Sequence, residues 1–289
     1  MELWMIYAIL GAIGTGCYGI CQKIETEENL VHRDAFIFYP YIFGTFAVGI
    51  TMYIFHIPLV FDIYLIIIGA MVSLLYVMIL RFRYFCLDYM SSSSYFINYR
   101  VFISIGLLFI GTFFFDEIIT LREYIGVGLG FIIFYLLVEK KTQSETVQDL
   151  KKGYFFLGAS VILAILIWVF QKQVTLTVYD MWSFVLYNSL IGIIISMFMR
   201  SKDQPQNMMK IKNCKALYFI LLTSLFFIPP YFFHLYPIYA GGDVAIVYKI
   251  ISYSLIFPVL FSILYYKEAV TKKKLLAFVL TIVSIWLFV

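Results

Sequence analysis

Charged residues are scarce in this sequence. Only 13% of its 289 residues are Asp, Glu, Lys or Arg, and 63% are hydrophobic. A soluble domain carries about 25% charged residues. The mean hydropathy is +0.94, so too little of the chain is polar to cover a water-soluble core. This shortage excludes an ordinary soluble globular fold.

The patterns of metal, redox and nucleotide chemistry are missing too. The four cysteines form no CxxC pair, and the three histidines lie far apart in the sequence, so we expect no metal site and no cofactor. The motifs GxxxxGK[ST] and GxSxG are absent, which argues against an ATP-driven pump and a serine hydrolase. The basic residues form no patch interleaved with aromatic residues, so we expect no nucleic-acid partner.

What the chain does contain is a series of long apolar runs. Each is about 18 to 24 residues, enough to cross a hydrocarbon core of roughly 30 Å as a helix. The first run lacks a basic flank and a cleavage site, so we expect a retained span and not a signal peptide. We predict an all-α integral membrane protein with ten spans, near 3–22, 35–55, 63–87, 92–115, 120–138, 153–172, 178–199, 215–238, 242–266 and 273–289.

The chain repeats itself, which predicts two five-helix domains at 1–145 and 146–289. The segment FDEIITLREYIGVGLGFIIFYLL (115–137) is similar to YKEAVTKKKLLAFVLTIVSIWLF (266–288). At nearly the same offset, Tyr99-Arg100 matches Tyr248-Lys249, and Gln22-Lys23 falls close to Gln171-Lys172. Because five spans is an odd number, the second copy must enter the membrane from the opposite side. Such inverted repeats are typical of secondary carriers with alternating access.

The end of each repeat resembles a known family. The stretches FFFDEIITLREYIGVGLGF and ILYYKEAVTKKKLLAFVL are similar to the repeat ends of the EamA-like drug/metabolite transporter superfamily. The resemblance implies ten helices around a central cavity, lined by the third, fourth, eighth and ninth spans among others. It does not fix a substrate, because members move amino acids, nucleotide sugars, sugar phosphates, amines and drugs.

Two cations lie deep in predicted spans. Arg100 and Lys249 are each roughly 12 Å from the start of the fourth and ninth spans. The inverted repeat would bring them together, and an anion between them would relieve their repulsion. The alternative is that both snorkel to the interface. The pair also resembles the basic residues of the triose-phosphate translocator branch, although Ile250 stands where that branch has a second basic residue.

Polar side chains near these cations complete the candidate substrate site. Tyr95, Asn98 and Tyr99 share a face of the fourth span, and Tyr248 precedes Lys249. They suit a polar ligand with an aromatic or sugar part. The alternative is coincidence, since the chain has 24 Tyr and 30 Phe.

Further candidates lie in the third and eighth spans. Arg81 and Arg83 are two residues apart, so at most one can face a cavity, and the other should reach lipid headgroups. Pro229 and Pro230 are predicted to interrupt the eighth span, and His234 follows one turn later. His234 could titrate during proton coupling, or it could be a structural donor.

The favoured function is transport of a small anionic or zwitterionic metabolite bearing phosphate or carboxylate. The alternatives are an exporter of amines, aromatic amino acids or drugs, and an integral-membrane lipid-handling protein or enzyme. We expect a small-molecule substrate and the lipid bilayer as partners, a monomer or homodimer, and a bacterial or archaeal cell membrane.

Charge also bears on orientation and coupling. Lys and Arg concentrate in the first, fifth, seventh and ninth connections, which predicts that the odd connections are cytoplasmic and both termini outside. The family resemblance implies termini inside. Acidic residues are nearly absent inside the predicted spans, since Asp34, Asp88, Asp180 and Asp243 all fall at span ends. This shortage favours exchange or facilitated movement over tight ion coupling.

Overall fold

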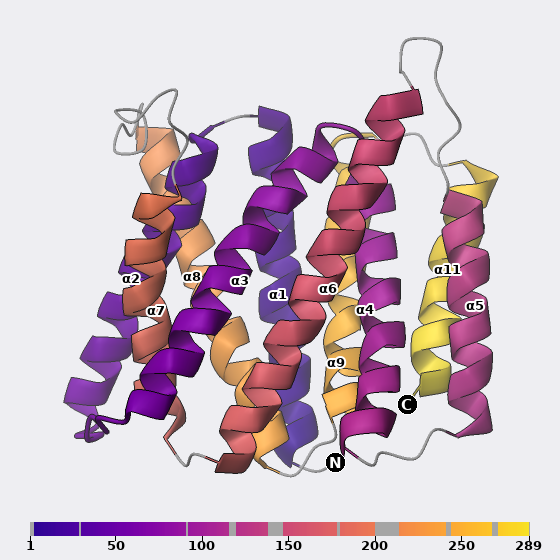
Figure 1. The fold of residues 1–289 in the computed structure, drawn as a ribbon. Helices are drawn as coiled ribbons and strands as arrows, with labels where there is room; N and C mark the ends of the chain where they lie inside the picture. The colour runs from indigo at the N-terminus through magenta and orange to yellow at the C-terminus, as the bar shows by residue number, and fades with distance from the viewer. Residues whose placement is uncertain are drawn as a thin grey trace.

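The structure is a computed structural model that describes residues 3–28, 30–90, 92–115, 120–137, 147–177, 180–199, 214–240, 244–267 and 271–288. Throughout these ranges the regular elements are helices, packed side by side (Figure 1). Their bounds are α1 (Leu3–Glu28), α2 (Arg33–Ile54), α3 (Ile63–Leu87), α4 (Ser92–Phe115), α5 (Leu121–Leu137), α6 (Val147–Thr177), α7 (Met181–Phe198), α8 (Cys214–Tyr239), α9 (Val244–Ser252), the 3-10 turn η1 (Tyr253–Leu255), α10 (Ile256–Leu264) and α11 (Lys272–Phe288).

Seven of these helices, α1 to α4 and α6 to α8, are long and apolar enough to cross a membrane. Shorter apolar stretches lie in α5, across α9–η1–α10 and in α11. These three segments run alongside the long helices (Figure 1), so they complete a ten-span arrangement. The predicted all-α membrane fold is confirmed.

The arrangement has the form of an inverted repeat. In Figure 1, α1 rises from the lower edge while α6 descends from the upper edge, and both chain ends lie low in the view. The packing of α1 against α8 is matched by that of α6 against α3. The equivalent pairs α2–α7, α4–α9 and α5–α11 each contact across the axis that relates the two halves. We propose the division at 145/146 for this repeat; the boundary itself lies outside the described residues.

Polar caps fix where several helices begin. Asp62 accepts a hydrogen bond from the backbone N–H of Tyr64 at 2.8 Å before α3. Asp180 accepts from the N–H of Trp182 at 3.0 Å and of Ser183 at 3.3 Å before α7. These carboxylates satisfy N–H groups that a helix start leaves without partners. The two caps therefore set the starts of α3 and α7.

The predicted interruption of the eighth span is wrong. α8 is continuous through Pro229 and Pro230, and its packing against α1 and α2 holds it in place. The break occurs in the ninth span, where η1 separates α9 from α10. Pro258 explains it, because proline has no N–H to bond the carbonyl of Ser254 and its ring crowds the preceding turn.

Candidate substrate cavity

A polar cavity lies at the centre of the helix bundle. Its empty space is about 910 Å³, part of it open to solvent. The described lining comes from α1, α3, α4, α6, α8 and the broken ninth span, which are three pairs of repeat-related elements. The residues are Thr15, Tyr18, Gly19, Gln22, Tyr76, Ile79, Arg83, Phe96, Tyr99, Arg100, Ile103, Ala164, Ile167, Trp168, Gln171, Phe227, His234, Tyr248, Ser254 and Pro258.

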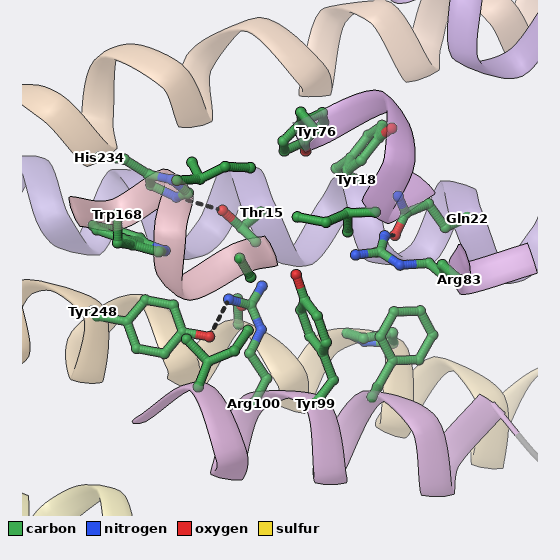
Figure 2. Close-up of a pocket in the computed structure, with 18 of the residues that line it drawn as sticks. Thr15, Tyr18, Gln22, Tyr76, Arg83, Tyr99, Arg100, Trp168, His234 and Tyr248 are labelled. Atoms are coloured by element: carbon green, nitrogen blue, oxygen red, sulfur yellow. Dashed lines mark hydrogen bonds between the residues drawn. The ribbon is translucent and has the colours of Figure 1, made fainter. Parts of the chain in front are cut away.

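Arg100 points from α4 into this cavity (Figure 2). Its Nη1 donates a hydrogen bond to Tyr248 Oη at 3.4 Å, and the guanidinium lies 5.8 Å from the centre of the Tyr248 ring. Tyr248 comes from α9, so this contact joins repeat-related helices. The side chain therefore remains in the cavity, contrary to the alternative that it snorkels to an interface.

Arg83 supplies a second cation to the same cavity. Its Nε donates to Tyr95 Oη at 3.1 Å, and its Nη1 donates to Gln22 Oε1. The guanidinium also lies 5.6 Å from the ring centre of Tyr95 and 5.5 Å from that of Tyr99. Neutral hydrogen-bond acceptors and aromatic faces surround this charge. Figure 2 shows Tyr99 between the two guanidinium groups.

The other predicted site residues fall in different places. Tyr95 is fully buried behind Arg83 and is not in the described lining. Asn98 is also fully buried, and its amide atoms have no hydrogen-bond partner among the described residues. Lys249 lies in α9, but its side chain is outside the described part of the chain. Its pairing with Arg100 therefore stays a prediction.

His234 belongs to an aromatic wall at one end of the cavity. Its Nε2 lies 3.0 Å from Thr15 Oγ1, which links α8 to α1. Its ring stacks on Trp168 with centroids 5.3 Å apart, and Trp168 meets Tyr248 edge-on at 5.0 Å. The histidine is thus both a structural link and part of the lining (Figure 2).

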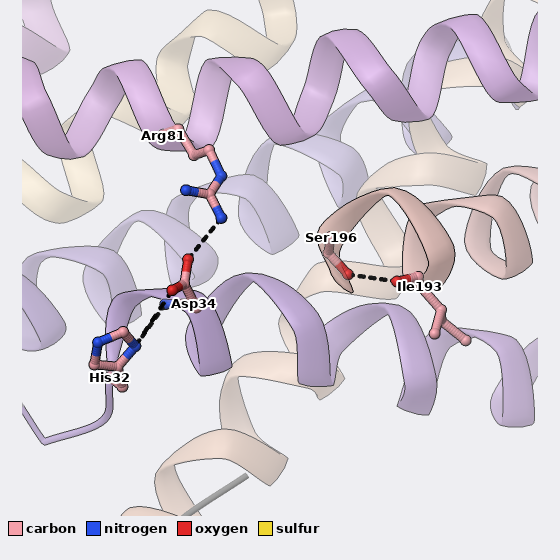
Figure 3. A network of polar contacts seen from close by, with 5 residues as sticks. All are labelled: His32, Asp34, Arg81, Ile193 and Ser196. Atoms are coloured by element: carbon pink, nitrogen blue, oxygen red, sulfur yellow. Dashed lines mark hydrogen bonds and ion pairs between the residues drawn. The ribbon is translucent and has the colours of Figure 1, made fainter. Parts of the chain in front are cut away.

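Arg81 does not reach the headgroups, so that expectation is wrong. Its Nη2 lies 2.6 Å from Asp34 Oδ1, and the two side chains are 19% and 7% exposed. His32 caps α2 beside this ion pair and accepts from the N–H of Asp34 at 3.3 Å (Figure 3). Asp34 is therefore a buried partner that holds α3 to α2. Arg81 is neutralised by it, whereas Arg83 faces the cavity.

The sequence reasoning missed several cavity residues because they carry no distinctive motif. In the sequence Gln22 and Gln171 stand out only as matching positions of the repeat, yet both line the cavity. Trp168 also lines it, and a single Trp in an apolar run gives no signal for a site. Glu25, which is 1% exposed, was not singled out either; it is the last residue of the apolar span of α1, so it agrees with the expectation that carboxylates lie at span ends.

Fold and cavity together define a polytopic α-helical membrane protein with an inverted repeat and a central polar site. Residues 151–289 match the EamA-like transporter family, so the second half of the chain is an EamA-like transporter domain and the resemblance to that superfamily is confirmed. One solved structure, described only as "Crystal structure of protein", has the same fold. It is 12% identical, with a TM-score of 0.69 over 98% of this chain and 96% of that chain. No curated protein matches the sequence.

Proposed function

We propose that the protein is a secondary transporter that moves a small organic anion, carrying phosphate or carboxylate, by alternating access. The observation that carries this proposal is that Arg83 and Arg100, from α3 and α4, both line the cavity. The described lining contains no Asp or Glu to neutralise them. Membership of the second half in a transporter family supports the general function.

The electrostatics favour an anion over the alternatives. A guanidinium within a bilayer costs several kcal/mol unless it is compensated, and phosphate and carboxylate bind it through two parallel hydrogen bonds. A cationic amine would instead meet two like charges in a weakly screened space. A zwitterion fits only with its anionic group toward Arg83 and Arg100.

Uptake into proteoliposomes tests the proposal directly. The panel contains sugar phosphates, dicarboxylates, nucleotides, amino acids and quaternary amines. We expect uptake of an anion, and a loss of at least about tenfold in Arg100→Gln or Arg83→Gln, since each bond to a charged group contributes about 1.5–3 kcal/mol. The matched control is Arg122→Gln, because Arg122 is exposed at the start of α5.

Two results would overturn the proposal. One is uptake of amines with no anion carried by the wild-type protein. The other is normal anion uptake by the Arg83→Gln/Arg100→Gln double variant. Lys249→Gln is tested alongside as the predicted third cation, and counterflow from substrate-loaded liposomes tests the expected exchange mode.

A further inference from the structure

One polar side chain at the break in the ninth span lines the cavity. Ser254 lies in η1, lines the cavity and is only 2% exposed overall. Its Oγ has no hydrogen-bond partner among the described residues. A buried hydroxyl without a partner is costly, so native structures nearly always satisfy it with protein, water or ligand.

Nearby serines show that this state is not general in the bundle. Ser252, two residues earlier, donates to the carbonyl of Tyr248 at 2.8 Å, and Ser104 in α4 donates to that of Arg100 at 3.0 Å. Both use the bond to a preceding-turn carbonyl that is typical of serine in a membrane helix. Ser254, in the middle of the 3-10 turn, makes no such bond among the described residues.

The break also changes the backbone at Ser254. In a continuous α-helix its carbonyl would accept from the N–H of residue 258, but proline has none. The equivalent positions in the first repeat, 149 residues earlier, are Ile105 and Phe109, and α4 is continuous there. The Ser254 carbonyl accepts from the N–H of Ile256 inside the turn, and Pro258 leaves its second lone pair without the usual helical donor. Among the described residues, the ninth span therefore presents a hydroxyl and a carbonyl lone pair at a depth where α4 has neither.

We propose that Ser254 is a substrate-contacting residue and that the transported anion carries a hydroxyl group. A substrate hydroxyl can accept from Ser254 Oγ and donate to the Ser254 carbonyl, so one group serves both. Its anionic group would bind Arg83 and Arg100, whose guanidinium groups face the same cavity. This inference rests on the proposed function, since it names the class of anion.

Matched pairs of anions test the inference in reconstituted full-length protein. The pairs are malate and succinate, lactate and propionate, and glycerol 3-phosphate and propyl phosphate. The wild-type protein should prefer the hydroxylated member of a transported pair by about tenfold in kcat/KM, the effect of one buried hydrogen bond. Ser254→Ala should remove this preference by raising KM for the hydroxylated member alone. Ser254→Thr and the control Ser252→Ala should retain it.

Each outcome separates this inference from the proposed function. Transport of anions with no hydroxyl preference, or an equal loss for both members in Ser254→Ala, would contradict the role of Ser254 and leave the anion carrier standing. The same holds if Ser254→Ala changes nothing, since a bound water would then satisfy the hydroxyl. If no anion is carried at all, the proposed function fails and this inference with it.

Discussion

Two helix crossings border the cavity, and the inverted repeat makes them equivalent. In the first, α1 meets α10, and a Cβ atom at Gly16 would lie 2.4 Å from Phe257 Cδ2. In the second, α6 meets α4, and a Cβ atom at Gly106 would lie 2.2 Å from Ile165 Cδ1. Each crossing uses a glycine for close approach, but on opposite members of the equivalent helix pairs.

Because small and large residues occupy opposite helices at the two crossings, the cavity is lined differently at each of them. Gly19 in α1 leaves room for Pro258, which lies 3.2 Å from its ideal Cβ position. The equivalent position in α6 is Trp168, which packs on His234 and Tyr248 instead. The two crossings therefore have equivalent backbones, but the broken ninth span lies at one and an aromatic wall lies at the other.

The largest expected effect is a loss of stability when the close packing at the first crossing is disturbed. Gly16→Ala should destabilise the protein by about 2–3 kcal/mol, because its Cβ also lies 3.0 Å from Phe257 Cβ, which cannot swing away. Gly106→Ala should cost about 1 kcal/mol, since the Ile165 Cδ1 methyl can move. Unfolding in detergent measures both, with Gly49→Ala as the control because nothing lies within 4 Å of that Cβ position. Equal losses at Gly16 and Gly49 would contradict the close packing.

The second prediction concerns a substitution that should make the two crossings alike. Pro258→Ala restores an N–H that can bond the Ser254 carbonyl, so the ninth span should become continuous like α4. We expect uptake to fall about tenfold without loss of stability, because removing proline from a helix interior relieves strain of roughly 3 kcal/mol. Slowed exchange of the new amide at position 258 would confirm the bond. Pro58→Ala, in the exposed connection before α3, is the control, and full activity of Pro258→Ala would show that the break is not needed.

The fold was largely predictable, and the break shows why the rest was not. Hydropathy gives ten spans because a helix must be apolar for about 20 residues to cross a bilayer. Proline does not by itself show where a helix breaks, since Pro229 and Pro230 sit in a continuous α8 while Pro258 accompanies η1. Arg83 was separable from Arg81 only once Asp34 was known to pair with Arg81 at 2.6 Å, and that partner is 47 residues away in sequence.

The third prediction compares the glutamines of the two crossing helices. Gln22 in α1 accepts a hydrogen bond from Arg83 Nη1. In the second repeat the position equivalent to Arg83 is Phe232, whose ring packs against Trp182. Gln22→Leu should raise KM for the anion about fivefold, the effect of losing roughly 1 kcal/mol of positioning. Gln171→Leu should raise it less than twofold. Initial-rate uptake measures both, and a larger effect at Gln171 would contradict the placement of the anionic group beside Arg83.

The smallest effects concern the tyrosines that the repeat places 149 positions apart. Tyr99 lies under Arg83, with 5.5 Å between guanidinium and ring centre, and Tyr248 lies under Arg100 at 5.8 Å. If the rings hold the cations, Tyr99→Phe and Tyr248→Phe should each raise KM less than about twofold, because the ring remains and the 3.4 Å bond from Arg100 to Tyr248 is long. Tyr99→Leu and Tyr248→Leu remove the aromatic face and should raise KM about three- to fivefold, in line with roughly 0.5–1 kcal/mol for such a contact. If phenylalanine is as damaging as leucine at one of the two positions, the hydroxyl and not the ring holds the arginine or the substrate there. The two repeat-related tyrosines would then have different roles, as the residues at the two crossings do.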